Sequence, residues 1–369
     1  MLRIKPFGIL VVGLLLSLAT SSTAQQETGS ANARPASRGL RWLEAQGAAR
    51  YIFVENRGSR VRMDDLQYKL HLKGQLRLDR RARTYLQFRV ETGSSFQPSW
   101  NFSGWGRNDS QQSLSVKDLF LSQKLGSRWE LQAGGIEFDQ GSGSEATWAD
   151  VDGFQVGYRV GFAPQRPGWP DRVQVTVSRI GEFQHPSVFA RLPGMRHPNS
   201  VQVLLEKKLV EGLQVSGEYD RIEQADFARF AIRWKPARWL DRVVVEAIAR
   251  TSQNPSLGYS VQFARTVKRA GPCTLTLTYS HMERGVFDGR RGRLLLNGDQ
   301  PNLGQRFLFQ AARPLPGGFT LTGFVSRQLD NTISVPRHDR WRAQLVVSYR
   351  FTPWLNARVP KPKSNRNGR

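Results

Sequence analysis

Along most of this chain, apolar and polar side chains alternate with a period of two residues. From Leu66 to Leu78 the even positions are apolar, aromatic or glycine, whereas the odd positions are Gln, Lys, His or Arg. Successive side chains of a β-strand point to opposite faces, so this pattern predicts a strand with one apolar and one wet face. Sixteen segments carry it: 47–55, 65–78, 83–92, 113–123, 129–137, 151–161, 172–180, 200–209, 213–221, 227–234, 242–250, 258–267, 273–283, 305–313, 318–328 and 340–351. No stretch shows a sustained helical period, and only segment 113–123 mixes its two faces.

The connections between these segments alternate between short and long. Residues 126–128 and 210–212 are tight turns, whereas 93–112 and 284–304 are long loops, and the alternation fails only at 162–171 and 222–226. An up-and-down meander with turns at one end and loops at the other produces this order.

A soluble sandwich and a membrane barrel would both alternate, but two observations favour the barrel. Sixteen meandering strands would leave long open edges, which soluble proteins avoid. The apolar faces carry almost no charge at mid-strand, where Arg or Lys facing lipid would cost roughly 2–4 kcal/mol. The exceptions Arg179, Lys207 and Arg265 lie near strand ends, where long side chains reach the interface. We therefore predict an all-β, up-and-down antiparallel transmembrane β-barrel of about sixteen strands.

Aromatic residues support this interpretation, because membrane barrels carry aromatic girdles at both interfaces. A soluble core would instead place such residues at strand centres. Those near strand ends on the apolar face are Trp129, Tyr219, Trp234, Tyr279, Trp341, Tyr349 and Phe351.

The first 24 residues read as an export signal. Arg3 and Lys5 precede an apolar stretch at 7–18, and Ser22 and Ala24 form a small-x-small cleavage site. The alternative is a buried N-terminal helix, and the stretch is too short to span a membrane. We expect a signal peptide at 1–24, a periplasmic N-terminal segment at 25–46, the barrel at 47–351 and a basic tail at 352–369, with both ends of the mature chain in the periplasm.

Export changes how the charge is interpreted. The chain holds 54 Lys and Arg against 30 Asp and Glu, a net charge of +24. In a cytosolic protein this would suggest nucleic acid, but an exported chain rarely meets it, so we expect no nucleic-acid partner. The single cysteine, Cys273, excludes an internal disulfide framework and a multi-cysteine metal site. With only five scattered histidines, we expect no metal site and no cofactor.

The polar faces of the predicted strands carry more basic than acidic residues. The ten basic residues that we expect to line a pore are Lys69, Lys73, Arg77, Arg89, Arg159, Arg229, Arg233, Arg250, Arg342 and Arg350, and Arg50, Lys208 and Arg306 share these faces. The acidic residues there are Glu91, Glu130, Glu206, Glu218, Asp220 and Glu246. A basic surplus inside a water-filled channel favours anions.

Salt bridges between neighbouring strands are the alternative role for these charges, and we expect them to involve about half of the residues. Arg229 and Arg233 lack an acidic partner on their own strand, so we expect this pair to attract anions rather than to brace the wall.

Calcium binding, catalysis and a purely structural role receive less support from the sequence. The acidic loop residues Glu137, Asp139, Glu145, Asp150 and Asp152 could bind calcium, but they lack EF-hand spacing and turn formation explains them more simply. No catalytic motif is present, which leaves His185, His197 and His338 as enzyme candidates without defensible partners. A plugged or structural barrel is the third class, in which loops 93–112 and 284–304 fold inward.

With its signal peptide, even strand count, alternating loops and final strand from Trp341 to Phe351, the chain resembles bacterial porins. Segments 132–141 and 150–154 are also similar to a hairpin of alginate-export and related porins. The chain departs from many porins by continuing past Phe351. The resemblance implies a passive diffusion channel for small solutes in a Gram-negative outer membrane. It also implies contact with lipid and lipopolysaccharide, assembly by the barrel-assembly machinery through the last strand, and formation of a homo-oligomer.

Overall fold

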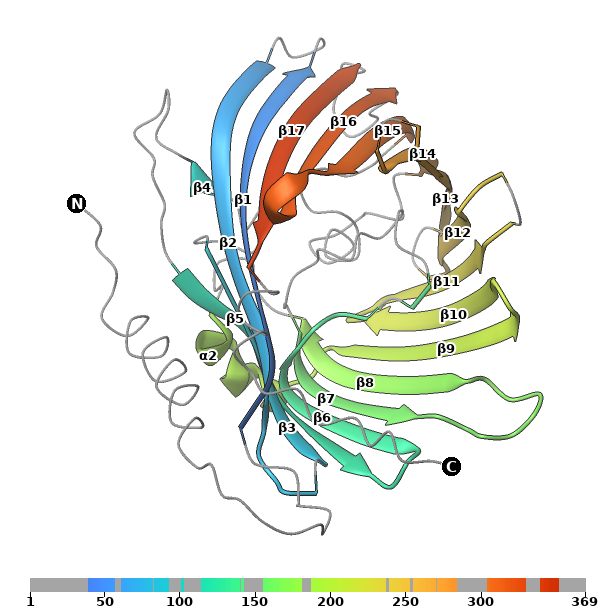
Figure 1. The fold of residues 1–369 in the computed structure, drawn as a ribbon. Helices are drawn as coiled ribbons and strands as arrows, with labels where there is room; N and C mark the ends of the chain where they lie inside the picture. The colour runs from blue at the N-terminus through green and yellow to red at the C-terminus, as the bar shows by residue number, and fades with distance from the viewer. Residues whose placement is uncertain are drawn as a thin grey trace, which may run out of the picture.

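The strands of this chain form a single antiparallel sheet that closes on itself. The computed structural model describes residues 39–56, 61–81, 83–92, 101–102, 114–139, 141–142, 155–180, 187–236, 239–252, 255–269, 271–283, 304–329 and 339–351. Figure 1 shows the strands following one another in a closed ring, with β1 beside both β2 and β17. Because β1 pairs with β17 from Gln46↔Arg350 to Asn56↔Arg340, the sheet has no open edge there, and the predicted barrel is confirmed.

Sixteen long strands build the wall over the described residues. They are β1 (Gly39–Asn56), β2 (Val61–Arg77), β3 (Thr84–Thr92), β5 (Leu114–Leu125), β6 (Trp129–Ile136), β7 (Gln155–Phe162), β8 (Arg172–Ile180), β9 (Ser200–Val210), β10 (Leu213–Ile222), β11 (Ala225–Trp234), β12 (Arg242–Arg250), β13 (Ser256–Val267), β14 (Cys273–Met282), β15 (Gly304–Pro314), β16 (Phe319–Leu329) and β17 (Arg340–Arg350). A two-residue strand, β4 (Asn101–Phe102), pairs with β2. The helices α2 (Val188–Arg191), η2 (Leu192–Arg196) and η5 (Pro316–Gly318) are short, and no helix in the described ranges is long and apolar enough to cross a membrane.

Connections of different length lie at the two ends of the barrel. Turns such as 126–128 and 211–212 lie at one end, here called the short-turn end. The strand ends that longer connections join, such as the end of β8 and the start of β9, lie at the other, the long-loop end. With an even number of long strands, β1 starts and β17 finishes at the short-turn end. The two ends of the described barrel therefore meet on one side.

The sixteen predicted segments coincide with the sixteen long strands, but some boundaries were wrong. β1 begins at Gly39, so residues 39–46 belong to the first strand and not to a segment outside the barrel. A bulge between Leu40 and Trp42 interrupts the alternation there, which hides the strand in the sequence. β7 is described from Gln155 onward, and residues 151–154 of the predicted segment lie outside the described residues. The expected signal peptide and basic tail lie outside the described residues.

Polar side chains turn inward and apolar side chains turn outward, the reverse of a soluble core. On β14, Thr276, Thr278 and Ser280 are buried, whereas Leu277 between them is 51% exposed. On β11, Arg229 is buried and the adjacent Phe230 is 51% exposed. An apolar outer band around a polar interior is the arrangement of a transmembrane barrel.

Aromatic rings gather at the strand ends on the outer face. At the short-turn end, Trp129 stacks on Phe162 with ring centroids 4.3 Å apart, and Tyr349 contacts Phe319 at 4.8 Å and Phe351 at 4.6 Å. These clusters agree with the girdles expected from the sequence.

The Lys and Arg side chains that point outward at strand ends donate hydrogen bonds to backbone carbonyls of neighbouring connections. Lys207 Nζ donates to the Trp169 carbonyl at 2.5 Å, and Arg179 Nη1 donates to the His197 carbonyl at 3.3 Å. Their positive charges are therefore held away from the middle of the apolar band.

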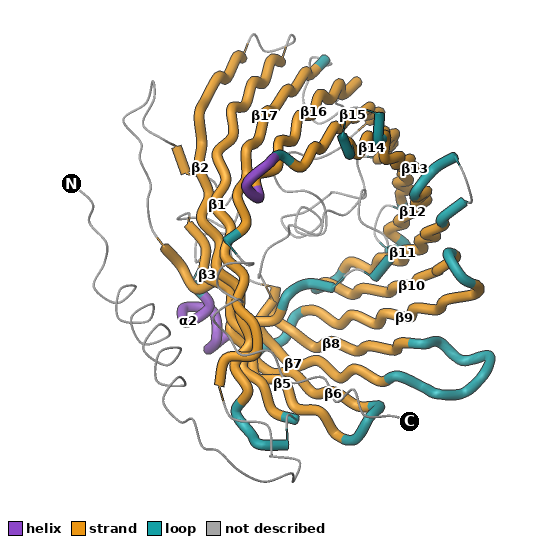
Figure 2. Tube along the Cα trace, in the orientation of Figure 1, coloured by secondary structure: helices purple, strands orange, loops and turns teal. Residues whose placement is uncertain are grey.

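A short helical segment, residues 187–196, packs against the outside of the barrel near the long-loop end. Figure 2 shows α2 outside the ring of strands, beside β5. Val188 is buried against Gly135, where an added Cβ would lie 2.2 Å from the valine Cγ2, and Arg191 Nη2 donates to the Lys117 carbonyl at 2.5 Å. No helical period could be recognised here from the sequence, because the segment is too short to establish one.

Candidate functional site

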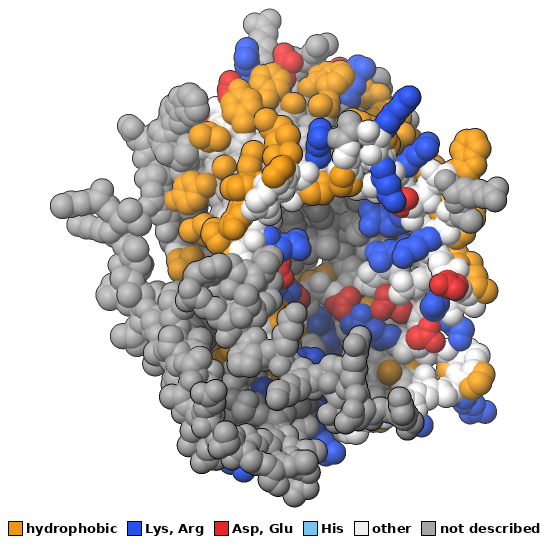
Figure 3. Space-filling view, in the orientation of Figure 1, with side chains coloured by type: hydrophobic (Ala, Val, Ile, Leu, Met, Phe, Trp, Pro, Cys, Tyr) orange, Lys and Arg blue, Asp and Glu red, His pale blue; other side chains and the backbone are white. Residues whose placement is uncertain are grey.

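The inner wall of the barrel carries most of the buried charged side chains. Figure 3 shows the molecule hollowed at its centre, with Lys and Arg in blue and Asp and Glu in red along the wall of the hollow. Alternation along the strands explains this concentration, because every second residue of the wall faces the lumen. The lumen is therefore the candidate functional site.

One ion-pair network lies on β2, β3 and β5. Arg89 Nε lies 2.6 Å from Asp118 Oδ2, and Arg89 Nη1 lies 3.8 Å from Glu137 Oε1. Lys73 Nζ lies 2.5 Å from the same Glu137 oxygen. These contacts join three strands to the start of the connection after β6, which is the bracing expected for part of the charges.

Glu91 extends this network along β3. Its side chain is 1% exposed, and its Oε1 lies 2.7 Å from His71 Nδ1, 4.0 Å from Lys69 Nζ and 3.9 Å from Arg89 Nη1. His71 thus faces the lumen, as expected, and pairs with a carboxylate.

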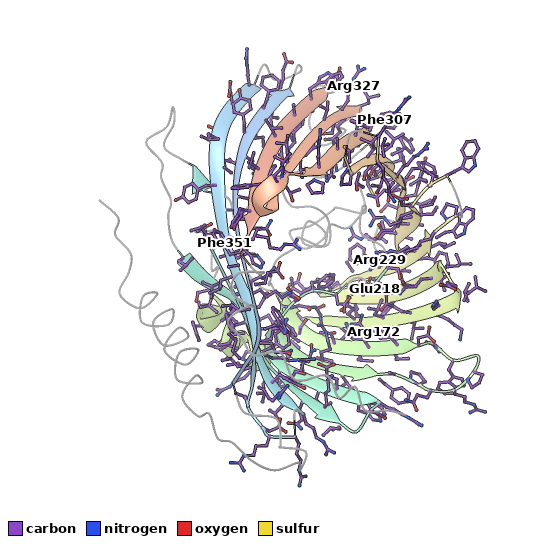
Figure 4. The ribbon with its side chains drawn as sticks, in the orientation of Figure 1. Arg172, Glu218, Arg229, Phe307, Arg327 and Phe351 are labelled. Atoms are coloured by element: carbon purple, nitrogen blue, oxygen red, sulfur yellow. The ribbon has the colours of Figure 1, made fainter. Side chains whose placement is uncertain are left out.

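A second network lies on β10, β11 and β12. Figure 4 labels Arg229 and Glu218 on neighbouring strands of the inner wall, and Arg229 Nη2 forms an ion pair with Glu218. On the other side, Arg229 Nη1 lies 3.2 Å from Glu246 Oε1. The three side chains are between 0% and 4% exposed. Arg229 therefore has acidic partners on both neighbouring strands, which favours the bracing role over the anion-attracting role that we expected.

The connection after β6 turns into the lumen. Arg159 Nη2 donates to the Glu137 carbonyl, and Gln202 Nε2 donates to the Asp139 carbonyl at 2.7 Å. Asp139 forms an ion pair with Arg172, which also lies 3.0 Å from Glu206 Oε2. Residues 137–142, with 140 outside the described set, are here called the inward segment.

The far end of the inward segment reaches β9–β11. The Ser142 amide donates to Ser216 Oγ at 3.2 Å, and Ser142 Oγ lies 3.3 Å from Glu206 Oε1. Arg233 Nη2 donates to the Ser142 carbonyl at 2.9 Å. The inward segment thus occupies part of the lumen, and Arg233 is one of the groups that hold it.

The remaining wall, β13–β17, differs from the rest. These five strands contain no Asp or Glu. We call this part of the wall the acid-free sector. Register places two rows across its five strands on the lumen side: Ser260, Ser280, Arg306, Gln328 and Arg340 in one, and Gln262, Thr278, Leu308, Ser326 and Arg342 in the next.

The other predicted basic residues lie at several positions on the wall. Arg250 Nε donates to the Ser252 carbonyl at 3.1 Å near the long-loop end, and Arg342 lies over the Phe324 ring at 5.4 Å. Arg350 Nε lies 3.9 Å from Glu44 Oε1 at the short-turn end, where Arg77 is half-buried. Arg50 Nε donates to Gln67 Oε1 at 2.5 Å, and Lys208 is exposed.

Several lumen residues escaped the sequence analysis. Asp118 was hidden because a bulge opposite Arg89 and Val90 mixes the faces of its strand, and the mixed pattern of 113–123 was the signal for that bulge. Asp139 lies in a connection, where alternation gives no information. Arg172 begins β8, at the boundary where assignment from sequence is least reliable.

The calcium and enzyme sites weighed as alternatives receive no support from the described residues. Glu137 and Asp139 are ion-paired with cations, and the described part of the chain holds no group of three or more His, Cys, Asp or Glu residues able to bind a metal ion. Glu145, Asp150, Asp152, His185 and His338 lie outside the described residues. Loops 93–112 and 284–304, which fold inward in the plugged-barrel alternative, also lie outside them apart from Asn101, Phe102 and Gly304.

Comparison with solved structures agrees with this architecture. OmpF of Salmonella typhi, in a complex with daunomycin, shares 12% sequence identity, with a TM-score of 0.53 over 84% of this chain and 97% of that one. OccK8 (OprE) of Pseudomonas aeruginosa has 9% identity and a TM-score of 0.49 over 84% and 98%. A triple mutant of the Rhodopseudomonas blastica porin has 10% identity and a TM-score of 0.48 over 84% and 100%.

Sequence comparisons find no likeness of this kind. No protein-family model matches the chain, and no curated protein matches it. At 12% identity, the likeness to OmpF concerns the fold. The chain therefore has the fold of a bacterial porin, a closed antiparallel barrel of sixteen long strands.

Proposed function

We propose that this protein is an outer-membrane channel for passive diffusion of small solutes, with a preference for anions. The observation that carries the proposal is the polar inner wall of a closed barrel, one sector of which holds arginines and no acidic residue. Charge on a channel wall raises the local concentration of the opposite ion.

The two parts of the wall contribute differently to this preference. On β2–β12, carboxylates such as Glu91, Asp118 and Glu218 lie next to Lys or Arg, so much of the charge there is compensated within the wall. In the acid-free sector, Arg306, Arg340 and Arg342 stand in rows whose other members are Ser260, Gln262, Thr278, Ser280, Ser326, Gln328 and Leu308, and the five strands carry no acidic residue. The sector therefore adds positive charge to the inner wall.

The inward segment narrows the passage. Arg159 on β7, Arg172 on β8 and Arg233 on β11 contact this segment and hold it on their side of the lumen. We therefore expect a solute to pass on the side of the acid-free sector. This position favours a size-limited channel over a wide pore. If the lumen were fully blocked, the barrel would serve adhesion or envelope structure instead.

Location and partners follow from the same proposal. We place the barrel in a Gram-negative outer membrane, reached through a signal peptide at 1–24 that is removed during export. Lipid and lipopolysaccharide would cover the outer face, where Ala311, Gly323 and Ala343 leave a groove of about 350 Å³ between Phe309 and Leu345. We also propose assembly through the last strand by the barrel-assembly machinery, a homo-oligomeric state and the absence of enzymatic activity.

Planar-bilayer recording tests the proposal. With purified protein and a potassium chloride gradient, we expect stepwise conductance and a reversal potential shifted toward the equilibrium potential of chloride. A shift toward the potassium value would contradict the anion preference. A silent bilayer would contradict the channel and favour the plugged or structural barrel.

A further inference from the structure

We propose that the short-turn end of the barrel binds the phosphate headgroups of anionic phospholipids, and that the connection between β7 and β8, residues 163–171, is its principal contact. Such binding selects one class of lipid among those that surround the barrel, and it is separate from channel activity. Exposed cations, exposed tryptophans and the fold of this connection point to it.

Cations outnumber carboxylates in the described turns of the short-turn end. Their exposed Lys and Arg residues are Arg80, Arg81, Arg83, Arg128, Arg166, Lys235, Lys268 and Arg269, and their acidic residues are Asp79, Asp171, Glu211 and Asp241. Among the described residues, none of these cations forms a salt bridge with a carboxylate. This end of the barrel therefore attracts anions from outside.

Three of the four carboxylates hold the turns in shape. Asp171 Oδ2 accepts a hydrogen bond from the Lys208 amide at 2.6 Å, and Asp241 Oδ2 accepts one from the Thr266 amide at 2.5 Å. Asp79 Oδ1 likewise accepts from backbone amides of its own turn. The carboxylates thus stabilise the backbone, and the net charge of the described turns stays positive.

Exposed tryptophans lie at the same end. Trp169 in the β7–β8 connection is 49% exposed, and Trp239 in the β11–β12 connection is 78% exposed. Trp129 and Trp234 are exposed at the neighbouring strand ends. Tryptophan concentrates at the headgroup level of a bilayer, where its ring meets apolar surface and its N–H meets water. A soluble anionic partner would account for the cations but not for these rings, so the surface favours a membrane.

The β7–β8 connection is the longest turn at this end, and it brings a cation and a ring together. In the tight turn from Arg166 to Trp169, the Trp169 amide donates to the Arg166 carbonyl at 3.2 Å. Pro167 in the second position and Gly168 in the third, with a φ of 85°, fit a type II turn. Because the first and last residues of such a turn lie close together, the Arg166 guanidinium carbon is 5.7 Å from the centre of the Trp169 ring.

Cations of two neighbouring elements contact this connection, which Figure 2 shows in teal between β7 and β8. Lys207 Nζ on β9 donates to the Trp169 carbonyl at 2.5 Å. Arg128 Nη2 in the β5–β6 turn donates to Gln165 Oε1 at 3.4 Å. Three cations from three elements, Arg128, Arg166 and Lys207, therefore lie on or against the same nine residues.

The depth of this cluster matches that of lipid phosphates. The stacked rings of Trp129 and Phe162 mark the edge of the apolar band, Arg128 directly precedes Trp129, and the connection directly follows Phe162. The cations are thus at the level where headgroups begin. Each Lys or Arg near an anionic membrane surface contributes about fivefold in affinity.

Electron spin resonance of the full chain in phosphatidylcholine vesicles tests the proposal. The vesicles contain a trace of phosphatidylglycerol or of phosphatidylcholine with a spin label on the acyl chain, and the immobilised fraction of each label gives its association with the protein. We expect phosphatidylglycerol to be favoured by about two- to fivefold. The triple variant R128Q/R166Q/K207Q should bring the ratio close to one.

The triple variant R80Q/R81Q/R83Q is the matched control. It removes the same charge from the β2–β3 turn, whose sequence from 78 to 83 contains no aromatic residue, so it should lower the ratio less. If R128Q/R166Q/K207Q fails to fold, the single variants R128Q and R166Q replace it, and each should lower the ratio.

The other outcomes overturn the proposal in different ways. A ratio of one in the unmodified protein would refute binding of anionic phospholipids. An equal loss in both triple variants would refute the assignment to the β7–β8 connection. A ratio of one together with co-sedimentation with purified peptidoglycan, lost in R128Q/R166Q/K207Q, would assign the surface to the cell wall instead. Because no current is measured, none of these results depends on the proposed channel.

Discussion

Replacing Arg229 by methionine should destabilise the barrel far more than it changes selectivity. Its guanidinium lies between Glu218 and Glu246, with Nη1 3.2 Å from Glu246 Oε1, and all three side chains are between 0% and 4% exposed. Removing one partner of a buried ion pair leaves an uncompensated buried charge, which costs about 3–5 kcal/mol. Here two carboxylates lose their shared cation, so we expect the upper part of that range.

Urea unfolding in lipid vesicles measures this free energy. The triple variant R229M/E218Q/E246Q removes the stranded charges together with the arginine, so it should recover most of the lost stability. Arg233→Met is the matched single change on the same strand, and it should cost less because Arg233 is half-buried and donates to the Ser142 carbonyl. A loss below about 1 kcal/mol for Arg229→Met, the range of an exposed pair, would refute the bracing role.

Three further predictions concern the inward segment, a turn and the outer face. Arg172→Gln should raise single-channel conductance by loosening the inward segment from Glu206, whereas Arg179→Gln, on the outer face of the same strand, should leave conductance unchanged. Asp79→Ala should lower the urea midpoint at pH 7, and this difference should shrink as the pH falls below ~4. The hydrogen bond from the Thr84 amide holds the pKa of the Asp79 carboxyl below its usual value, so the stabilisation is present above pH ~4 and is lost as the pH falls through the lowered pKa. Leu277→Arg on the outer band should cost roughly 2–4 kcal/mol in vesicle refolding, and Thr276→Arg on the inner face should cost less.

Most of the fold could be predicted from the period-two alternation of apolar and polar residues. It located all sixteen long strands because the wall is buried against lipid on one side and lined by polar groups on the other, so each side chain reports its face. Alternation failed where the ladder is irregular. The bulge at Leu40 and Trp42 concealed the start of β1, and the bulge opposite Arg89 and Val90 concealed Asp118.

The candidate site was less accessible to sequence reasoning. The faces of Arg229 and Glu218 followed from alternation, but their contact depends on the register between β10 and β11, which one sequence does not determine. The inward course of residues 137–142 depends on Arg172, Gln202 and Arg233 from three different strands. Contacts of this kind arise only when the barrel closes.

The central claim, that solutes pass along the inner face of this barrel, is tested most directly by cysteine modification during current recording. In a Cys273→Ser background, cysteine is placed at Gln310, which faces the lumen, or at Phe309, which is 48% exposed on the outer band. A water-soluble, negatively charged thiol reagent should reduce the current stepwise for Gln310→Cys and leave Phe309→Cys unchanged. Equal modification of both, or modification of Phe309→Cys alone, would contradict the account.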